Sequence, residues 1–318
     1  MGIPSSKLSV ELDRDPAIYY GSELVTGIVR LMTNDIHFSQ KQLSVNLLGR
    51  AMHEITYYRG SEKHHKVVTF TFLTKTVILT QSCSDEQKYF SSHGQHSWLF
   101  EIELPTHIPP TFSIPHIFHT DHPAVEYSII ASLQQSVLAI TDTKVIFFRP
   151  PILLTPQTAV VLSSVNRKDV FMNVNLFEGL FCVAGSVIQG TIQIENPQHK
   201  HIKRVECSII QTLQVKDDSV VNKIIDVILP IITDGTDNHY EGTFEIPISE
   251  YIPPTFQRLS ASGESGPPVN VSYTIKFEVC MSGFFVDFSI TKPLTVTIDP
   301  WIHENDGTIK LIDRTQLV

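Results

Sequence analysis

The best candidate for a metal-binding motif in this chain is a set of three histidines spaced three residues apart, His116, His119 and His122. His93 and His96 repeat the spacing once more. Imidazole binds zinc, but structural zinc sites are closed tetrahedra in which thiolates are common ligands. No cysteine neighbours either group, and no helical pattern would hold residues i and i+3 on one face. We therefore interpret both groups as polar loop histidines, and we expect no metal and no cofactor.

Sequence motifs of catalytic sites do not occur in this chain. There is no G-x-S-x-G nucleophile elbow, no G-x-x-x-x-G-K-[ST] phosphate loop and no H-E-x-x-H zinc motif. The glycine-containing segment Ser262–Gly266 lacks the strand-then-helix context that a phosphate-binding loop needs. No pair of carboxylates is singled out by its surroundings. We therefore predict that the protein is not an enzyme.

The first residues of the chain fit the pattern for an N-terminal lipid. Met1 and Gly2 are followed by Ser6, which matches the myristoylation motif M-G-x-x-x-[ST]. Acylation of Gly2 would allow peripheral membrane contact, although one myristoyl chain binds a bilayer only marginally and needs a second contact. The alternative is that these residues are an ordinary frayed terminus.

Composition indicates a folded protein that does not bind nucleic acid. Hydrophobic residues make up 42% of the chain and charged residues 18%. The 24 Lys and Arg residues against 33 Asp and Glu give a net charge of −9, which disfavours binding to a phosphate backbone. The four cysteines form no C-x-x-C pair, and no signal peptide or membrane-length apolar run occurs. These features favour a reducing, cytoplasmic setting.

Alternation of apolar and polar residues dominates the chain and predicts an all-β fold. From Val271 to Val279 every second residue is apolar, which is typical of a strand with one buried face. We see no long segment of helical periodicity, and two packed sheets per domain would bury one face of each strand. Further predicted strands are Leu24–Leu31, Val67–Thr80 and Val187–Ile194.

A duplicated pentapeptide shows how these strands are organised. Ile-Pro-Pro-Thr-Phe occurs at Ile108–Phe112 and again 144 positions later at Ile252–Phe256, each time eight residues after Phe-Glu-Ile. We infer two copies of one module: residues 1–150, and residues 151–318 ending in a short polar tail. A proline-rich connector, Arg149–Pro156, separates them. Because proline cannot donate to a ladder, we expect each Pro-Pro pair to end the strand beginning at Phe100 or Phe244.

Several of these segments resemble a known family. They are similar to the first strand and the closing part of arrestin N-terminal domains, and to the opening strands of arrestin C-terminal domains. The order and duplication make the resemblance specific, and it covers the chain from about Leu8 to about Asp299. The segments are Tyr20–Val29, Phe100–Phe112, Val125–Ala131, Gly185–Asn196 and Cys207–Gln211.

The resemblance is closest to the α-arrestins, the arrestin-domain-containing proteins. It implies two tandem immunoglobulin-like β-sandwiches and a non-enzymatic cytosolic adaptor or scaffold. Such an adaptor links the cytoplasmic tails of membrane receptors or transporters to endocytosis, endosomal sorting, signalling or ubiquitination machinery. It would be cytoplasmic, with recruitment to the plasma membrane or endosomes. Its partners would be cargo tails and trafficking proteins.

Direct recruitment of a ubiquitin ligase is not expected, because this chain departs from the family pattern. Many α-arrestins carry Pro-Pro-x-Tyr motifs that bind WW domains, and here no Pro-Pro pair is followed by that tyrosine. A ligase would therefore be recruited indirectly, through another partner. The four Pro-Pro pairs begin at Pro109, Pro150, Pro253 and Pro267.

The resemblance also points to binding residues. In arrestins, basic residues near the first strand engage phosphorylated receptor tails, and Lys7, Arg14 and Arg30 are the basic residues in that region here. A phosphopeptide would add along the strand edge, with charge-assisted contacts to these side chains. The alternative is that they are solvated surface charges that protect a sheet edge.

Two other functions fit parts of the sequence. A structural trafficking-coat subunit, like the arrestin-fold component of retromer, would assemble stoichiometrically instead of docking on a signal. A ligand- or carbohydrate-binding β-sandwich would be secreted and carry disulfides, for which the sequence gives no indication.

Overall fold

The protein is built from β-strands joined by turns and extended segments, and no helix occurs among the described residues. The all-β fold predicted from the alternating pattern is therefore confirmed. The computed structural model describes residues 6–33, 42–80, 94–113, 122–134, 139–150, 158–167, 169–232, 234–258, 266–283 and 287–298.

The chain divides into two compact units. Most of the first half forms one unit and most of the second half forms the other, but two segments of the second half pack with the first unit. The first unit contains Met1–Pro150, Thr212–Val221 and Phe256–Val271. The second contains Pro151–Gln211, Asn222–Thr255 and Ser272–Val318.

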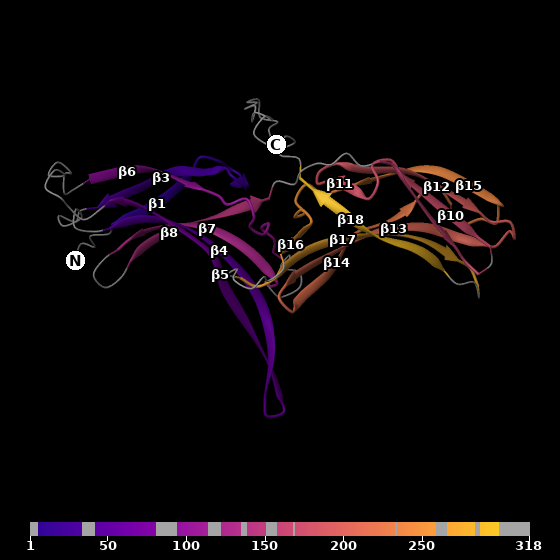
Figure 1. Ribbon diagram of the computed structural model, residues 1–318, viewed down its shortest axis with the longest axis horizontal. Coiled ribbons are helices and arrows are strands. Elements are labelled where there is room, and N and C mark those ends of the chain that lie inside the picture. Colours follow the sequence, from indigo (N-terminus) through magenta and orange to yellow (C-terminus); the bar gives the residue numbers. More distant parts are fainter. Residues whose placement is uncertain are drawn as a thin grey trace. The chain divides into compact units, whose positions relative to one another are not determined.

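The first unit is a sandwich of two sheets, drawn as two layers of strands in Figure 1. A three-stranded sheet has the order β1-β3-β6, and a five-stranded sheet has the order β2-β8-β7-β4-β5. Strand β1 is therefore an edge strand. The strands are β1 (Lys7–Leu12), β2 (Ile18–Tyr20), β3 (Leu24–Thr33), β4 (Leu43–Arg59), β5 (Glu62–Thr80), β6 (Gly94–Glu103), β7 (Ala124–Leu133) and β8 (Ile140–Arg149).

The other two sheets lie mostly in the second unit, although the parts of their strands within Thr212–Val221 and Phe256–Val271 belong to the first. A four-stranded sheet has the order β15-β12-β10-β9, and a six-stranded sheet has the order β11-β18-β17-β13-β14, with β16 paired to β17. The strands are β9 (Val160–Val165), β10 (Phe171–Leu176), β11 (Phe181–Val183), β12 (Val187–Glu195), β13 (Ile202–Val215), β14 (Asp218–Leu229), β15 (His239–Pro247), β16 (Phe256–Arg258), β17 (Val269–Met281) and β18 (Phe288–Thr297).

Period-two alternation places the predicted apolar residues in the two cores. On β17, Val271, Tyr273, Ile275, Phe277 and Val279 are all at most 2% exposed, as the sequence pattern predicts. Phe277 packs on Phe244 of the opposite sheet with ring centroids 5.4 Å apart. Burial of each such side chain contributes about 2 kcal/mol, so the alternating faces hold the two layers together.

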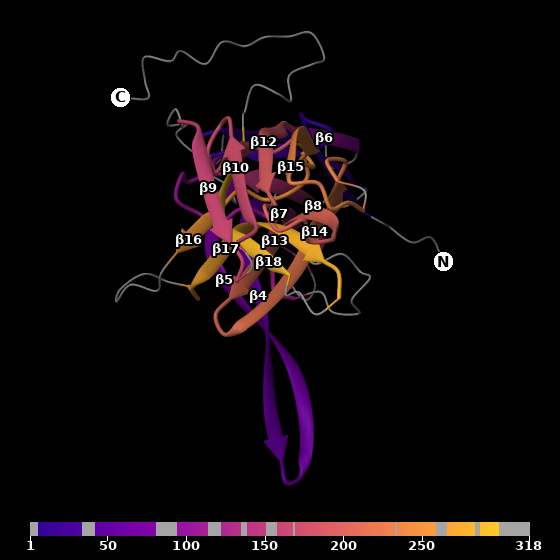
Figure 2. The same ribbon diagram turned by 90° about the vertical axis from the view of Figure 1, so that its right-hand side faces the viewer.

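The hairpin β4–β5 extends well beyond the sandwich of the first unit, as Figures 1 and 2 both show. Strand β4 pairs with β7 only as far as Met52, and from His53 to Arg59 it pairs with β5 alone. His53 is still buried, but from Thr56 to Lys63 the side chains of this two-stranded ribbon are exposed, and Tyr58 is 70% exposed.

The duplicated pentapeptide forms the same corner in both halves. Tyr127 donates its hydroxyl hydrogen to the carbonyl oxygen of Pro109 at 2.6 Å, and Tyr273 does the same to Pro253 at 2.5 Å. The hydroxyl oxygen of Thr111 accepts from the backbone of β8 at 2.8 Å, and Thr255 accepts from β18 at 2.8 Å. The motif therefore attaches a crossing segment to the sheet in each copy, which confirms the internal duplication.

The Pro-Pro pairs do not end the strands that the sequence assigned to them. Strand β6 begins at Gly94, not Phe100, and ends at Glu103, before Pro109. Strand β15 begins at His239, not Phe244, and ends at Pro247. In the first copy Leu104 still donates to Glu23 at 2.9 Å, and Pro105, which has no N–H to donate, follows it. In the second copy the pairing continues past Pro247, because Ile248 donates to Ser186 at 2.8 Å.

Candidate functional site

Two of the three predicted phosphate-binding residues lie together on the outer face of the three-stranded sheet. Lys7, Ser9 and Glu11 face outward on the edge strand β1. In the register with β3, Lys7 lies opposite Met32 and Ser9 lies opposite Arg30. Lys7 and Arg30 are thus diagonal neighbours, close enough for long side chains to reach one anionic group.

The third residue, Arg14, lies elsewhere. It follows the far end of β1, about 20 Å from Lys7 at the rise of an extended strand. Its guanidinium donates to Glu23 at 2.9 Å and to the carbonyl of Ile18 at 3.1 Å, and it lies 4.8 Å from the ring centroid of Tyr19. Arg14 therefore holds the turn between β1 and β3, and the structure does not bring it to the other two.

Arg30 also has a carboxylate partner. Its guanidinium contacts Glu11 on the neighbouring strand at 3.1 Å. Both side chains are largely exposed, so this ion pair stabilises little and can be exchanged for another anion.

The free edge of β1 is partly capped by a carboxylate. The backbone N–H of Val10 donates to Asp142 of β8 at 2.7 Å. Backbone hydrogen-bonding groups alternate in direction along a strand. Leu8 and Leu12 therefore point their N–H and C=O groups to the same free edge as Val10 does. An added strand could use this edge only after Asp142 releases Val10.

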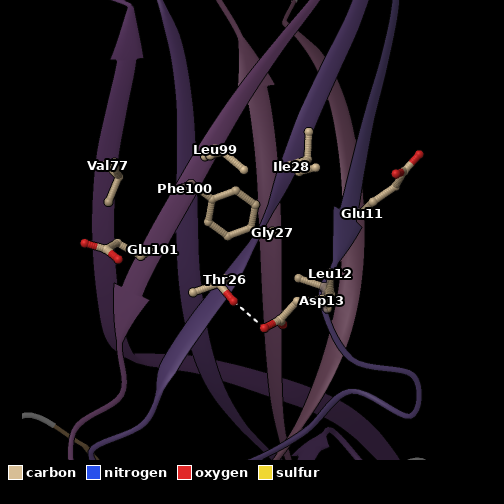
Figure 3. A pocket seen from close by; sticks show the side chains of 10 residues that line it. All are labelled: Glu11, Leu12, Asp13, Thr26, Gly27, Ile28, Val77, Leu99, Phe100 and Glu101. Atoms are coloured by element: carbon tan, nitrogen blue, oxygen red, sulfur yellow. Dashed lines mark hydrogen bonds between the residues drawn. The ribbon is translucent and has the colours of Figure 1, made fainter.

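A pocket of about 600 Å³ lies at the opposite end of the same three strands (Figure 3). It is lined by three consecutive residues on each strand, residues 11–13, 26–28 and 99–101, together with Val77 of β5. The register aligns them in three rows: Glu11–Ile28–Leu99, Leu12–Gly27–Phe100 and Asp13–Thr26–Glu101.

The middle row depends on a glycine. A Cβ on Gly27 would lie 2.3 Å from the carbonyl oxygen of Glu11 and 2.8 Å from the Phe100 ring. The ring of Phe100 therefore occupies the space that a side chain at position 27 would fill. Figure 3 shows this ring at the centre of the pocket.

Carboxylates surround the pocket, and none of the described residues that line it is a Lys or Arg. Asp13 accepts hydrogen bonds from the hydroxyls of Thr26 and Tyr19, the latter at 3.0 Å (Figure 3 shows the Thr26 bond). Burial, and then the charge of Asp13, raise the pKa of Tyr19, so this hydroxyl stays a donor. Sequence reasoning missed this acidic group. Its signal was the acidic residues in and just after the strands, Glu11 and Asp13, then Glu101 and Glu103.

The second unit has an equivalent but less acidic pocket of about 410 Å³. Gly190 lies opposite Phe244 as Gly27 lies opposite Phe100, and a Cβ there would lie 2.4 Å from a backbone oxygen and 2.7 Å from the Phe244 ring. Glu245 is the only carboxylate among the lining residues that the structure describes. The pocket is thus a feature of the duplicated fold, whereas its charge differs between the copies.

One of the predicted loop histidines has carboxylate contacts in the first unit. His122 contacts Glu54 of β4 at 3.2 Å through Nε2 and Asp218 at 3.3 Å through Nδ1. Asp218 also accepts from the backbone N–H of Glu54 at 2.7 Å. The cluster ties the segment around Asp218 to β4.

The other predicted histidine and lipid positions are mostly outside the described residues. His93, His116, His119 and Gly2 all lie there, while His96 stacks on Trp98 with ring centroids 5.8 Å apart. Within the described part of the chain, no three His, Cys, Asp or Glu side chains are grouped as metal ligands would be. The described residues also contain no helix of the length and hydrophobicity that crossing a bilayer requires.

Both halves of the chain match known protein families. Residues 8–147 match the family described as arrestin (or S-antigen), N-terminal domain. Residues 169–300 match the family described as arrestin (or S-antigen), C-terminal domain. No curated protein matches the chain significantly.

Proposed function

Because this chain belongs to the arrestin superfamily, we propose that it is a non-enzymatic cytosolic adaptor for membrane cargo. Its cargo would be the cytoplasmic tails of receptors or transporters, which it would link to endocytic, endosomal sorting or ubiquitination machinery. The observation that carries this proposal is the presence of both arrestin domains, in order, over most of the chain. We assign residues 1–150 and 151–318 to the two domains, and we place the protein nearest to the α-arrestins.

In this proposal a cargo tail binds along β1. Its backbone pairs with the edge groups of Leu8, Val10 and Leu12 once Asp142 has released the N–H of Val10. A phosphate on the tail then reaches Lys7 and Arg30, where charge-assisted hydrogen bonds replace the exposed ion pair of Arg30. Arg14 contributes by keeping the turn after β1 in place.

Membrane recruitment would come from the cargo, with Gly2 as a site of lipidation that supplies a second weak contact. Without a Pro-Pro-x-Tyr motif, a ubiquitin ligase would join through another trafficking protein.

Proximity labelling in the native cell tests the adaptor role. A biotin ligase fused to the C-terminus should label membrane cargo and endosomal proteins above the level of a free cytosolic ligase. Labelling of soluble enzymes alone would overturn the proposal. Comparing the wild type with Gly2→Ala separates lipid anchoring from cargo binding, since unchanged membrane recovery would eliminate the anchor.

Phosphate recognition is tested by fluorescence anisotropy with a labelled peptide that alternates phosphoserine with valine. Lys7→Glu should weaken binding about three- to tenfold, because one attractive contact becomes repulsive. Lys292→Glu on β18 of the second unit makes the same change of charge and should have no effect. Equal effects of the two variants would remove Lys7 from the site.

A further inference from the structure

We propose that the acidic pocket on β1, β3 and β6 binds a peptide segment in which Lys or Arg alternates with apolar residues. The proposal concerns the opposite end of the face from Lys7 and the opposite charge of ligand. It rests on the proposed function for the source of that segment, a cargo tail, but its chemistry follows from the pocket.

Two outward-facing rows of side chains make this surface both apolar and acidic. In the row Glu11–Ile28–Leu99 two apolar side chains lie side by side, and Leu99 is 79% exposed. In the next outward row Thr26 lies between Asp13 and Glu101. Carboxylates therefore stand on both outer strands with an apolar pair beside them, which suits a ligand that carries cations and apolar groups in alternation.

The negative charge of this region is only partly compensated. Asp13 accepts from two neutral hydroxyls, those of Thr26 and Tyr19, and its charge also interacts with the adjacent guanidinium of Arg14. The backbone of Glu101 pairs with β3, but its carboxylate forms no ion pair or hydrogen bond with any residue that the structure describes. Glu11 shares its charge with Arg30 through an exposed contact. Complementary charge therefore favours a basic occupant over an acidic one.

Cytoplasmic tails of membrane proteins offer such an occupant. Their segments next to the membrane are enriched in Lys and Arg, and they follow directly on an apolar span. A tail lying along β1 would place its basic segment beside Asp13, and the segment would then cross the outer face of the sheet to Glu101 on β6. Its more distant residues would lie near Lys7, about 20 Å further along an extended chain. The two ends of this face would thus bind opposite charges, and this would fix the orientation of the bound tail.

The equivalent pocket of the second unit explains why the first is the candidate. It has the same glycine and phenylalanine, but Gln189 and Thr243 stand where the first pocket has Thr26 and Leu99. Its one carboxylate, Glu245, already accepts from Gln189 at 2.9 Å. Position 245 therefore supplies a matched control for position 101.

Fluorescence anisotropy on the full chain tests the proposal with two labelled peptides, one alternating Lys with Leu and one alternating Glu with Leu. The Lys peptide should bind more tightly, and added salt should weaken it. Glu101→Lys should weaken it about three- to tenfold, and Leu99→Ser should also weaken it, while Glu245→Lys should not. Both Glu101 and Leu99 are exposed, so these variants should fold, and thermal unfolding checks this.

Three outcomes would overturn the inference. The first is equal binding of the two peptides, and the second is an equal effect of Glu101→Lys and Glu245→Lys. The third is a change of oligomeric state in Glu101→Lys, which would assign the face to self-association.

Proximity labelling distinguishes failure of this inference from failure of the adaptor role. If wild type and Glu101→Lys label the same membrane cargo equally, the adaptor role stands and the pocket is wrong. If the wild type labels no membrane cargo, the adaptor role fails whatever the peptides do.

Discussion

At the scale of single residues, two tyrosine hydroxyls determine how the duplicated motif is held. Each buried hydroxyl donates to the carbonyl of the first proline of a pair, Tyr127 to Pro109 and Tyr273 to Pro253. Because proline has no backbone N–H, its carbonyl oxygen is its one backbone polar group, and a buried carbonyl needs a hydrogen-bond donor. The hydroxyl supplies that partner without interrupting the strand.

Replacing Tyr127 with phenylalanine should therefore destabilise the protein by about 1 to 2 kcal/mol, because the Pro109 carbonyl loses its donor inside the core. Urea unfolding would measure the change. Tyr58→Phe removes a hydroxyl that is open to solvent and should change stability by less than about 0.5 kcal/mol. Equal effects would show that the buried bond contributes nothing.

Because two cysteine thiols are buried, we expect the folded protein to lose stability at high pH. Burial raises the pKa of Cys182 and that of Cys207 to about 12, above the ordinary value of 9.0. The folded state therefore holds these protons more tightly than the unfolded state does. The stabilisation is complete below pH 9 and is lost as the pH rises from 9 toward 12.

Urea unfolding at pH 8 and pH 10.5 checks this. The wild type should lose more stability between the two pH values than the double variant Cys182→Ala and Cys207→Ala, which has no such thiols to ionise. The same loss in both proteins would place the pH dependence in other groups.

At the scale of elements, a glycine in an inner strand of each smaller sheet permits close packing of three strands. Gly27 and Gly190 each lie against a backbone oxygen of one neighbour and a phenylalanine ring of the other. This requirement is local, and it recurs because both units place a phenylalanine opposite the glycine.

Gly27→Ala should destabilise the first unit by about 2 to 3 kcal/mol, because the added methyl group overlaps Phe100 and a backbone oxygen that cannot move freely. Gly60→Ala, in the open hairpin turn at φ +66°, meets no atom within 4 Å and should cost only about 1 kcal/mol of conformational strain. Urea unfolding of both variants makes the comparison. A smaller effect at position 27 than at position 60 would contradict the packing argument.

The β4–β5 hairpin shows where alternation stops predicting an element. The sequence predicts a strand over Val67–Thr80, whereas β5 begins at Glu62. Beyond Met52 the hairpin pairs, among the described strands, only with itself, and from Thr56 to Lys63 its side chains are exposed, so these residues need not alternate. The ladder of hydrogen bonds, not a hydrophobic face, defines this part of the strand.

At the scale of the whole molecule, the first unit is not one continuous stretch of sequence. The segments Thr212–Val221 and Phe256–Val271 pack with it, and Asp218 accepts from the backbone of Glu54 at 2.7 Å. A fragment of residues 1–150 lacks these partners.

In that fragment, β4 should exchange its amide hydrogens about tenfold faster than in the full chain, which corresponds to about 1.4 kcal/mol of lost local stability. Hydrogen–deuterium exchange would measure this, and Asp218→Ala in the full chain should reproduce part of the increase. Unchanged exchange would show that residues 1–150 form a self-sufficient domain.

The sequence by itself determined the fold class, the duplication and the family. Side-chain period fixes which face of a strand is buried, and order along the chain is preserved in the repeats, so both can be read without coordinates. Tertiary structure decided how charges meet. It paired Arg14 with Glu23 and Arg30 with Glu11, and it gathered Glu11, Asp13 and Glu101 around one pocket. Strand register across β1, β3 and β6 made that arrangement, because it aligns residues that lie far apart in the sequence.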